Sequence, residues 1–258
     1  MSSKHTPKTG IGYSTEDQIF VNGMNLVDDV MGKFTFTDFI YLHLTGARPT
    51  PSQAALLDVV LVTLMEHGLT PSAIVTRLIY HSAPEAIQAA VAAGLTGVGS
   101  TFIGTMEGCS ALLDEMLTAP EGSQLRARAI AERHRAERRP IHGFGHPIHK
   151  PDDPRSARML SLAEQHHVPG RHIAALRELS AEVDRAYGRH LTINATGASA
   201  ALLGEIGIPG NIMRGVALIS RSAGLVGHIR EEMRDPAARH IWGIVESTIP
   251  YERKQDGE

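Results

Sequence analysis

The chain has 258 residues, of which 42% are hydrophobic, enough for one sizeable core or two modest domains. Its 25 Lys and Arg against 28 Asp and Glu give a net charge of -3, which argues against nucleic acid or an anionic membrane as a partner. No apolar stretch approaches the ~20 residues that a membrane helix needs, and the start MSSKHTPKTG is polar, so we expect a cytoplasmic protein.

The first half of the chain shows helix signals and almost no strand-like alternation, which predicts an all-α fold. N-cap residues and prolines at helix starts predict the first helices, over Ser52–Glu66, Pro71–Tyr80 and Pro84–Ala93. The glycine-rich segment Gly94–Gly108 then permits close backbone approach and is interpreted as a crossing between domains, followed by an apolar helix over Cys109–Leu117.

The second half continues with helices separated by short breaks. Ser123 is expected to cap a helix that ends in the basic run RHRAERR, residues 133–139, interpreted as a solvated face in preference to a phosphate site. Further helices are expected over 153–166, 171–187, 198–205 and 211–233, and the polar tail from Arg234 is expected to wrap or fray. The single cysteine, Cys109, is interpreted as a buried thiol.

The loop GFGHPIHKPDDPR, residues 143–155, is the most informative stretch of the sequence. Two glycines permit a tight backbone that exposes His146, and Asp153-Pro154 starts a helix that directs Arg155 back toward the loop. A guanidinium binds a carboxylate at two points and an imidazole bonds to a keto or hydroxyl oxygen, so this loop favours a hydroxy or keto acid. A metal site of His142, His146 and His149 is the alternative, but no carboxylate or cysteine completes it and no metal is expected.

The same loop closely resembles the GFGHRVYKNYDPR-type signature of the citrate synthase family. Three further segments resemble that family in the same order: residues 23–46, HGLTPSAIVTR from His67, and SRSAG from Ser220. The resemblance spans about residues 12–231 and implies that His67, His146, Arg155 and Arg221 bind a four-carbon keto acid or the matching end of a citryl group.

The resemblance also implies an α-helical homodimer that binds an acyl-CoA and a polycarboxylate, with coenzyme A as part of the substrate. The large domain would comprise residues 1–104 and 209–258, and the small domain, residues 105–208, would close over a cleft and keep water from an enolate. Lys150, Arg138 and Arg139 are candidate contacts to the phosphates of coenzyme A, since phosphates attract basic groups.

Two catalytic positions depart from the family pattern. The segment STFIGT places Ile103 or a neighbour where the family has a histidine that polarises the thioester, and Asn194-Ala-Thr196 places Thr196 or Asn194 where the family has a catalytic aspartate. A hydroxyl or an amide is a poor base near neutral pH. The tail also lacks the arginine-proline-arginine type segment by which a second subunit grips the substrate; Arg234 and Arg239 are the arginines nearest to that place.

We therefore expect a citryl-CoA lyase-like enzyme that forms acetyl-CoA and oxaloacetate, with His146, Glu107 and Thr196 as the candidate catalytic residues. Glu107 would supply a replacement acid or base, unless it serves only as a favourable charge at a helix start. The alternatives are a non-Claisen acyl-CoA enzyme, an inactive protein that binds coenzyme A or a polycarboxylate, and a purely structural dimer module.

Overall fold

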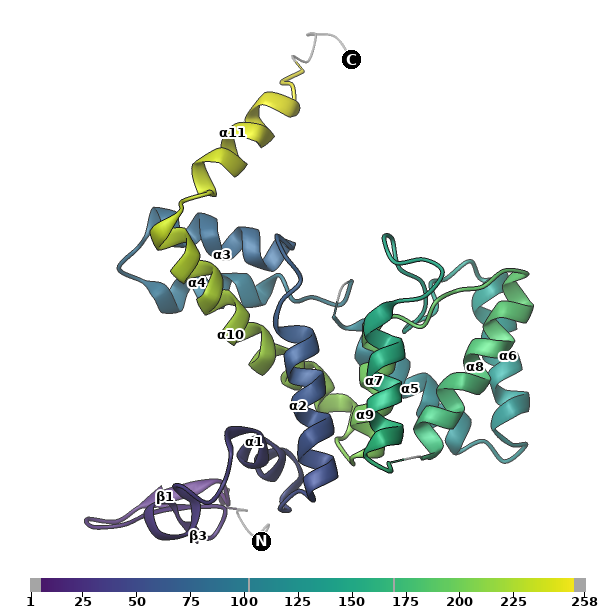
Figure 1. Ribbon diagram of the computed structural model, residues 1–258, viewed down its shortest axis with the longest axis horizontal. Coiled ribbons are helices and arrows are strands. Elements are labelled where there is room, and N and C mark those ends of the chain that lie inside the picture. The colour runs from purple at the N-terminus through teal and green to yellow at the C-terminus, as the bar shows by residue number, and fades with distance from the viewer. Residues whose placement is uncertain (1–5, 102, 169, 253–258) are drawn as a thin grey trace, which may run out of the picture.

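The computed structural model describes residues 6–101, 103–168 and 170–252. Over these residues the fold is all-α, as the sequence predicts (Figure 1). The helices in chain order are η1 (Leu26–Val30), α1 (Phe36–Thr45), α2 (Pro51–Met65), α3 (Pro71–Ser82), α4 (Ile87–Thr96), α5 (Thr105–Leu117), α6 (Ser123–Ala136), α7 (Pro154–Gln165), α8 (Arg171–Tyr187), α9 (Ala195–Glu205), η2 (Gly210–Ile212), α10 (Met213–Arg234) and α11 (Ala238–Thr248). No helix in these ranges is long and apolar enough to cross a lipid bilayer.

A small antiparallel sheet near the start of the chain was not predicted. It contains β1 (Gly12–Ser14), β2 (Ile19–Val21) and β3 (Met24–Asn25), in the order β1-β2-β3. Strands of two or three residues are too short for the apolar and polar alternation that identifies a strand in sequence, so this sheet left no signal in the sequence.

Several helices start at positions that differ from the predicted ones. The helix expected from Pro84 begins at Ile87, after a turn. The helix expected from Cys109 begins one turn earlier, at Thr105. Ser123 does not cap its helix: the N-cap is Gly122, and the Ser123 hydroxyl instead forms a hydrogen bond with Glu178 on α8. For Ser123, a contact with another helix takes the hydroxyl that local propensity assigns to capping.

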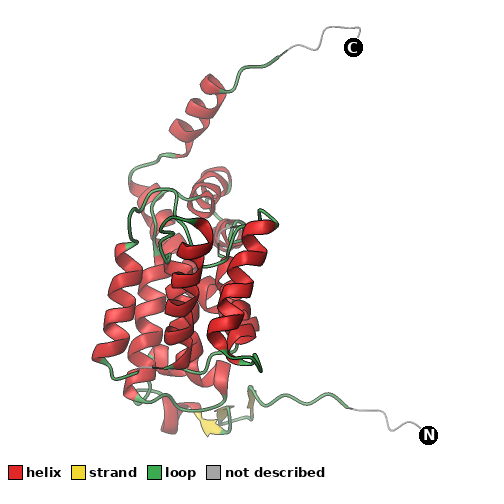
Figure 2. Cartoon of the chain, turned by 90° about the vertical axis from the view of Figure 1, so that its right-hand side faces the viewer, coloured by secondary structure: helices red, strands yellow, loops and turns green. Residues whose placement is uncertain are grey.

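The tail is the largest correction to the predicted elements. Residues expected to wrap or fray form α11, which projects from the body in both views (Figures 1 and 2). Its apolar side chains are largely exposed, including Trp242 at 62% and Val245 at 49%.

The core lies around α9, which packs against α5, α7, α8 and α2. A small residue on α9 also lets a loop pack closely on it: a Cβ on Gly197 would stand 2.4 Å from the carbonyl oxygen of Gly143. Cys109 is fully buried in this core, as predicted, and burial raises the pKa of its thiol to about 12. Figure 1 shows α5–α9 on one side and α3, α4 and α10 on the other; the domain boundaries at 104/105 and 208/209 stay a prediction.

Candidate functional site

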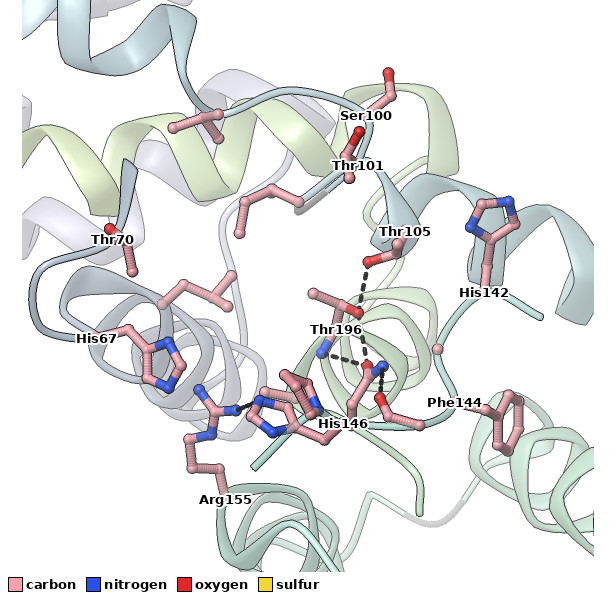
Figure 3. Close-up of a pocket in the computed structure, with 18 of the residues that line it drawn as sticks. His67, Thr70, Ser100, Thr101, Thr105, His142, Phe144, His146, Arg155 and Thr196 are labelled. Carbon is pink, nitrogen blue, oxygen red and sulfur yellow. Dashed lines mark hydrogen bonds between the residues drawn. The ribbon is translucent and has the colours of Figure 1, made fainter. Parts of the chain in front are cut away.

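A cavity of about 630 Å³ opens where the ends of several helices meet. Its walls come from the turn after α2, the segment between α4 and α5, the loop 140–148, and the facing parts of α7, α9 and α10 (Figure 3). The elements that build the cavity therefore come from opposite ends of the chain, and the long-range packing of helices decides its shape.

The loop from Gly143 to His149 is shaped by its glycines and by residues 192–194. Gly143 and Gly145 have φ values of +89° and +78°, which side chains rarely adopt, and a Cβ on Gly143 would stand 2.6 Å from Cys109 Sγ. The Gly143 carbonyl accepts a hydrogen bond from Asn194 N at 3.0 Å, and Gly145 N donates one to the Thr192 carbonyl at 2.8 Å. These constraints hold His146 at the cavity wall, as the glycines in the sequence suggested.

The tautomer of His146 follows from its hydrogen bonds. Its Nδ1 accepts the backbone N–H groups of Ile148 at 3.1 Å and His149 at 3.0 Å, so in the neutral ring the proton lies on Nε2. Arg155 Nη2 lies 3.4 Å from this Nε2, which brings two donors to the same space. An oxygen atom of a bound ligand could accept from both.

Arg155 is oriented by the buried carboxylate of Asp153, which caps α7. Asp153 accepts from Arg155 Nη2 at 2.8 Å and Nε at 3.0 Å. Burial alone would raise the pKa of Asp153, but the hydrogen bonds and charge of Arg155 outweigh it and hold this pKa below its usual value. The fixed guanidinium can present its remaining donors to the cavity.

Arg221, on α10, is 6% exposed and lines the same cavity. Among the described residues its Nη1 has no hydrogen-bond partner. Burial lowers the pKa of Arg221, and the nearby charge of Glu66 partly offsets this effect. A buried cation with an unsatisfied donor is costly in the empty protein and well suited to an anionic ligand.

His67 lies in the turn after α2 and faces His146, with ring centroids 6.1 Å apart (Figure 3). Burial, and then the charges of Arg155 and Arg221, hold the pKa of His67 below its usual value, so the ring is neutral near pH 7. The structure thus brings together the four predicted substrate binders, His67, His146, Arg155 and Arg221, which we call the charged end of the cavity.

Three imidazoles meet at the charged end, although they are not the trio considered from the sequence. One ring nitrogen from each of His67, His146 and His149 lies within 4.8 Å of the others, while His142 lies against Gly108 of α5. Binding a metal through Nε2 of His146 would require removal of the proton that its hydrogen bonds place there. Two guanidiniums nearby would also repel a cation, so this geometry favours an anion.

The opposite end of the cavity, which we call the neutral end, holds Ile103, Thr105, Asn194 and Thr196. The Thr196 hydroxyl donates to Asn194 Oδ1 at 2.7 Å and lies 2.8 Å from Thr105 Oγ1 (Figure 3). Its proton is therefore committed to the amide oxygen. No carboxylate is among the described lining residues of this cavity; Phe102, in the segment where the family has its histidine, lies outside the described residues.

Two predicted residues lie elsewhere. Glu107 pairs with Arg214 at 2.6 Å and is not in the cavity wall, because its helix turns it toward α10. Lys150 is exposed and lines neither this cavity nor the neighbouring one. The structure gives neither side chain a contact with the proposed reacting groups.

A second, basic cavity adjoins the first. Pro140, Ile141, Phe144 and Gly145 line both, and the second cavity also contains the predicted Arg138 and Arg139. Arg135, from the same basic run, and Arg189, which the sequence had not indicated, complete its cluster of guanidiniums. The basic run was interpreted mainly as a solvated face, yet three of its arginines line this cavity.

Sequence reasoning also missed two carboxylates that hold the predicted substrate-binding residues in place. Asp153 was predicted only as a helix cap, although its spacing from Arg155 already allowed an ion pair. Glu66 gave no signal beyond its place before His67. Its carboxylate accepts the backbone N–H groups of His67 and Gly68.

The described residues form an all-α fold in which paired guanidiniums and imidazoles surround one cavity, and such groups are chemically suited to a small polyanion. Comparison with known families identifies the family of this chain. The model of the citrate synthase C-terminal domain matches residues 20–242, and the chain belongs to the citrate synthase family.

Citryl-CoA lyase from Hydrogenobacter thermophilus is similar to this chain over nearly its full length: 28% identity, a TM-score of 0.87, and coverage of 98% of this chain and 97% of that one. ATP citrate lyase from Methanothrix soehngenii, in complex with citrate and coenzyme A, shares the fold at 18% identity, with a TM-score of 0.78 and coverage of 99% and 43%. Citrate synthase from Acidithiobacillus ferridurans is 29% identical over 77% of this chain and 51% of its own length. The chain thus spans about half the length of the curated citrate synthases that it matches.

Proposed function

We propose that this chain cleaves a citryl-CoA-type thioester to acetyl-CoA and oxaloacetate. The observation that carries the proposal is the charged end of the cavity, where two guanidiniums and two imidazoles converge without a carboxylate in the described lining. The similarity to a citryl-CoA lyase over nearly the full length of both chains supports the lyase as the type of enzyme.

Binding of the citryl group follows from the donors at the charged end. Arg155 and Arg221 take carboxylates, because guanidiniums bind them at two points and Arg221 holds an unsatisfied buried donor. The Nε2–H of His146 donates to the tertiary oxygen and stabilises the alkoxide that precedes cleavage. His146, a candidate catalytic residue from the sequence, is therefore a hydrogen-bond donor in this scheme and not the acceptor of the hydroxyl proton.

His67 is then the proton acceptor in this scheme. Its lowered pKa keeps the ring neutral near pH 7, and its ring faces His146. Removal of the hydroxyl proton forms the keto group of oxaloacetate as the carbon–carbon bond breaks, and the electron pair passes to the enolate of acetyl-CoA.

The neutral end receives this enolate. Thr196 has its proton committed to Asn194 and cannot serve as an efficient acid or base, so the enolate carbon takes its final proton from water, and the hydroxide that remains is neutralised by the proton that His67 releases. The reverse reaction needs a base for a weakly acidic C–H, and the described lining offers no carboxylate there. Both directions share the same transition states, so we expect slow turnover, with cleavage favoured where its products are removed.

The thioester carrier completes the proposal. Coenzyme A would place its phosphates on the guanidiniums of the second cavity, including Arg138 and Arg139, since that cavity shares walls with the first. We also propose a cytoplasmic homodimer in which residues 105–208 close over the site, and we expect no resident metal.

The test is direct. Purified protein incubated with citryl-CoA should release oxaloacetate, detected as oxidation of NADH by malate dehydrogenase. Arg155→Gln should abolish this release, whereas Arg158→Gln, an exposed arginine on the same helix, should not. Intact citryl-CoA after prolonged incubation with the wild-type protein would overturn the proposal.

One observation favours a second function. The Thr196 hydroxyl donates its proton to Asn194 and is not free to act as an acid or a base. This arrangement fits a protein that binds a polycarboxylate or coenzyme A without breaking a carbon–carbon bond. Citrate or coenzyme A at ~100 times its dissociation constant would then stabilise the fold by about 2.7 kcal/mol while citryl-CoA stays intact.

A further inference from the structure

The turn that carries His67 is held by a chain of charged contacts that leads away from the cavity. Glu66 ends α2, and its Oε1 accepts the N–H of His67 at 2.8 Å and that of Gly68 at 2.6 Å. Both amides belong to the turn that presents the imidazole. The Glu66 carboxylate therefore fixes the backbone of a substrate-binding residue without facing the reacting groups itself.

The next link is on α10. His228 Nε2 lies 2.9 Å from Glu66 Oε2, and His228 Nδ1 accepts a hydrogen bond from Arg77 Nε at 3.1 Å. Close packing makes this contact possible, because a Cβ on Gly224 would stand 2.1 Å from the Met65 carbonyl oxygen. The end of α2 is thus pressed against the helix that also carries Arg221.

Arg77 on α3 continues this series of contacts to α11. Its side chain is 3% exposed; Nη1 donates to Glu232 at 2.9 Å, and Nη2 pairs with Glu231. The Glu232 carboxylate, 2% exposed, also accepts the N–H groups of Ala237 at 3.0 Å and Ala238 at 2.9 Å, at the start of α11. Buried charges held in one network are strongly coupled, since removing one leaves its neighbours unpaired.

We infer that Glu66 is a positioning residue for the charged end of the cavity, and that His228, Arg77 and Glu232 connect it to the first turn of α11. The inference rests on the proposed anion binding at His67 and Arg221 and extends it to residues outside the cavity wall. It assigns to the start of α11 an influence on substrate affinity.

Two variants test the two ends of this network. Glu66→Gln keeps an oxygen that can accept from the turn but removes the charge, and Glu232→Gln does the same beside α11. Citrate affinity, measured by calorimetric titration, should fall about tenfold in Glu66→Gln, as expected for loss of one charged hydrogen bond, and less in Glu232→Gln. Under turnover kcat should fall as well, because the same turn holds His67, the proposed proton acceptor. A merely structural defect would lower the fraction of folded protein and leave the citrate affinity of the folded fraction unchanged.

The matched control is Glu132→Gln, which breaks an exposed pair with Arg128 on α6 and should leave the citrate affinity unchanged. The double variant Glu66→Gln/Glu232→Gln should lose less affinity than the two single losses combined, because both act through one network. Wild-type affinity in a folded Glu66→Gln protein overturns the inference. Should that variant not fold, Glu66→Asp, whose shorter side chain cannot reach both the turn and His228, is judged by the same criterion.

A readout without ligand separates this inference from the proposed function. Glu232→Gln should speed amide hydrogen exchange at His67 and Gly68, relative to Glu132→Gln, because the contacts that order their turn are weakened. Unchanged exchange at both amides overturns the connection to α11 even in a protein that binds no citrate. Faster exchange in a protein that binds no citrate would support the connection and leave the proposed function to fail alone.

Discussion

The charged and neutral ends of the main cavity differ in what their polar groups are bonded to. At the charged end, Arg221 has a donor without a partner in the described part of the chain, and Arg155 and His146 direct two donors at the same space. At the neutral end, Thr196 and Asn194 satisfy each other. Unsatisfied groups are ready for a ligand and satisfied groups are not, so the charged end is prepared for an anion while Thr196 and Asn194 at the neutral end are not free to act as an acid or a base.

Removing the buried guanidinium of Arg221 should have the largest effect on citrate binding at the charged end. Arg221→Met should weaken citrate binding about 10²–10⁴-fold, as expected for loss of a two-point charged contact. The melting temperature should not fall, because the variant also removes the cost of a buried, partly unpaired charge. Titration calorimetry and thermal unfolding check both points, with Arg158→Met as the control; citrate binding at wild-type strength would contradict the role of Arg221.

Placing a carboxylate at the neutral end tests whether this end lacks a base that can remove a proton from acetyl-CoA. Thr196→Asp should accelerate exchange of the acetyl-CoA methyl protons with deuterated solvent by about 10²–10⁴-fold, the usual contribution of a positioned base. Proton NMR measures this exchange. Thr196→Asn, of the same shape but without a charge, is the control; rapid exchange in the wild-type protein would show that another residue already acts as the base.

The glycine loop that joins the two ends should be intolerant of side chains. Gly143→Ala should lower the free energy of unfolding by about 2–5 kcal/mol, because the alanine must adopt a positive φ and displace Cys109. Gly227→Ala, where a Cβ meets nothing within 4 Å inside α10, should instead be neutral or stabilising. Chemical denaturation of both variants checks the prediction, which fails if the two behave alike.

Lowering the pH should decrease the stability of the empty protein and increase its affinity for citrate. The lowered pKa values of His67 and His146 mean that the unfolded chain binds protons more tightly, so stability is full above about pH 6.5 and declines as the pH falls through the lowered values. A bound anion favours imidazolium, so citrate affinity should rise over the same range. Unfolding scans between about pH 5 and 8, with and without citrate, measure both trends. His67→Gln and His146→Gln should each flatten the trends, and parallel curves in the wild type and these variants would assign them to other groups.

Metal removal should have the smallest effect. The proton on His146 Nε2 and the two nearby guanidiniums disfavour a cation, so EDTA should leave the citrate-induced rise in melting temperature unchanged. A loss of that rise, restored by zinc but not by magnesium, would show that the three imidazoles bind metal.

The loop and its partners show how far sequence reasoning reached. The family-like segments correctly predicted that His67, His146, Arg155 and Arg221 would meet, because each belongs to a short motif whose local geometry is encoded by its glycines, caps and helix starts. Glu107 was expected near the chemistry from its place in a glycine-rich turn, but the rotation of α5 directs it to Arg214. A sequence motif does not specify which face of a helix points toward the cavity.

The sequence by itself determined the helical class, the glycine loop and the identity of the residues at the charged end, because these depend on local backbone preference and on short motifs. Tertiary structure decided the tautomer of His146, the commitment of Thr196, the network from Glu66 to Glu232 and the extension of α11. The network from Glu66 to Glu232 joins atoms from distant parts of the chain, and such contacts leave no periodic pattern in the sequence. The hydrogen bonds of His146 and Thr196 are local in sequence, but they form only in the loop and helix-cap geometry of the folded chain.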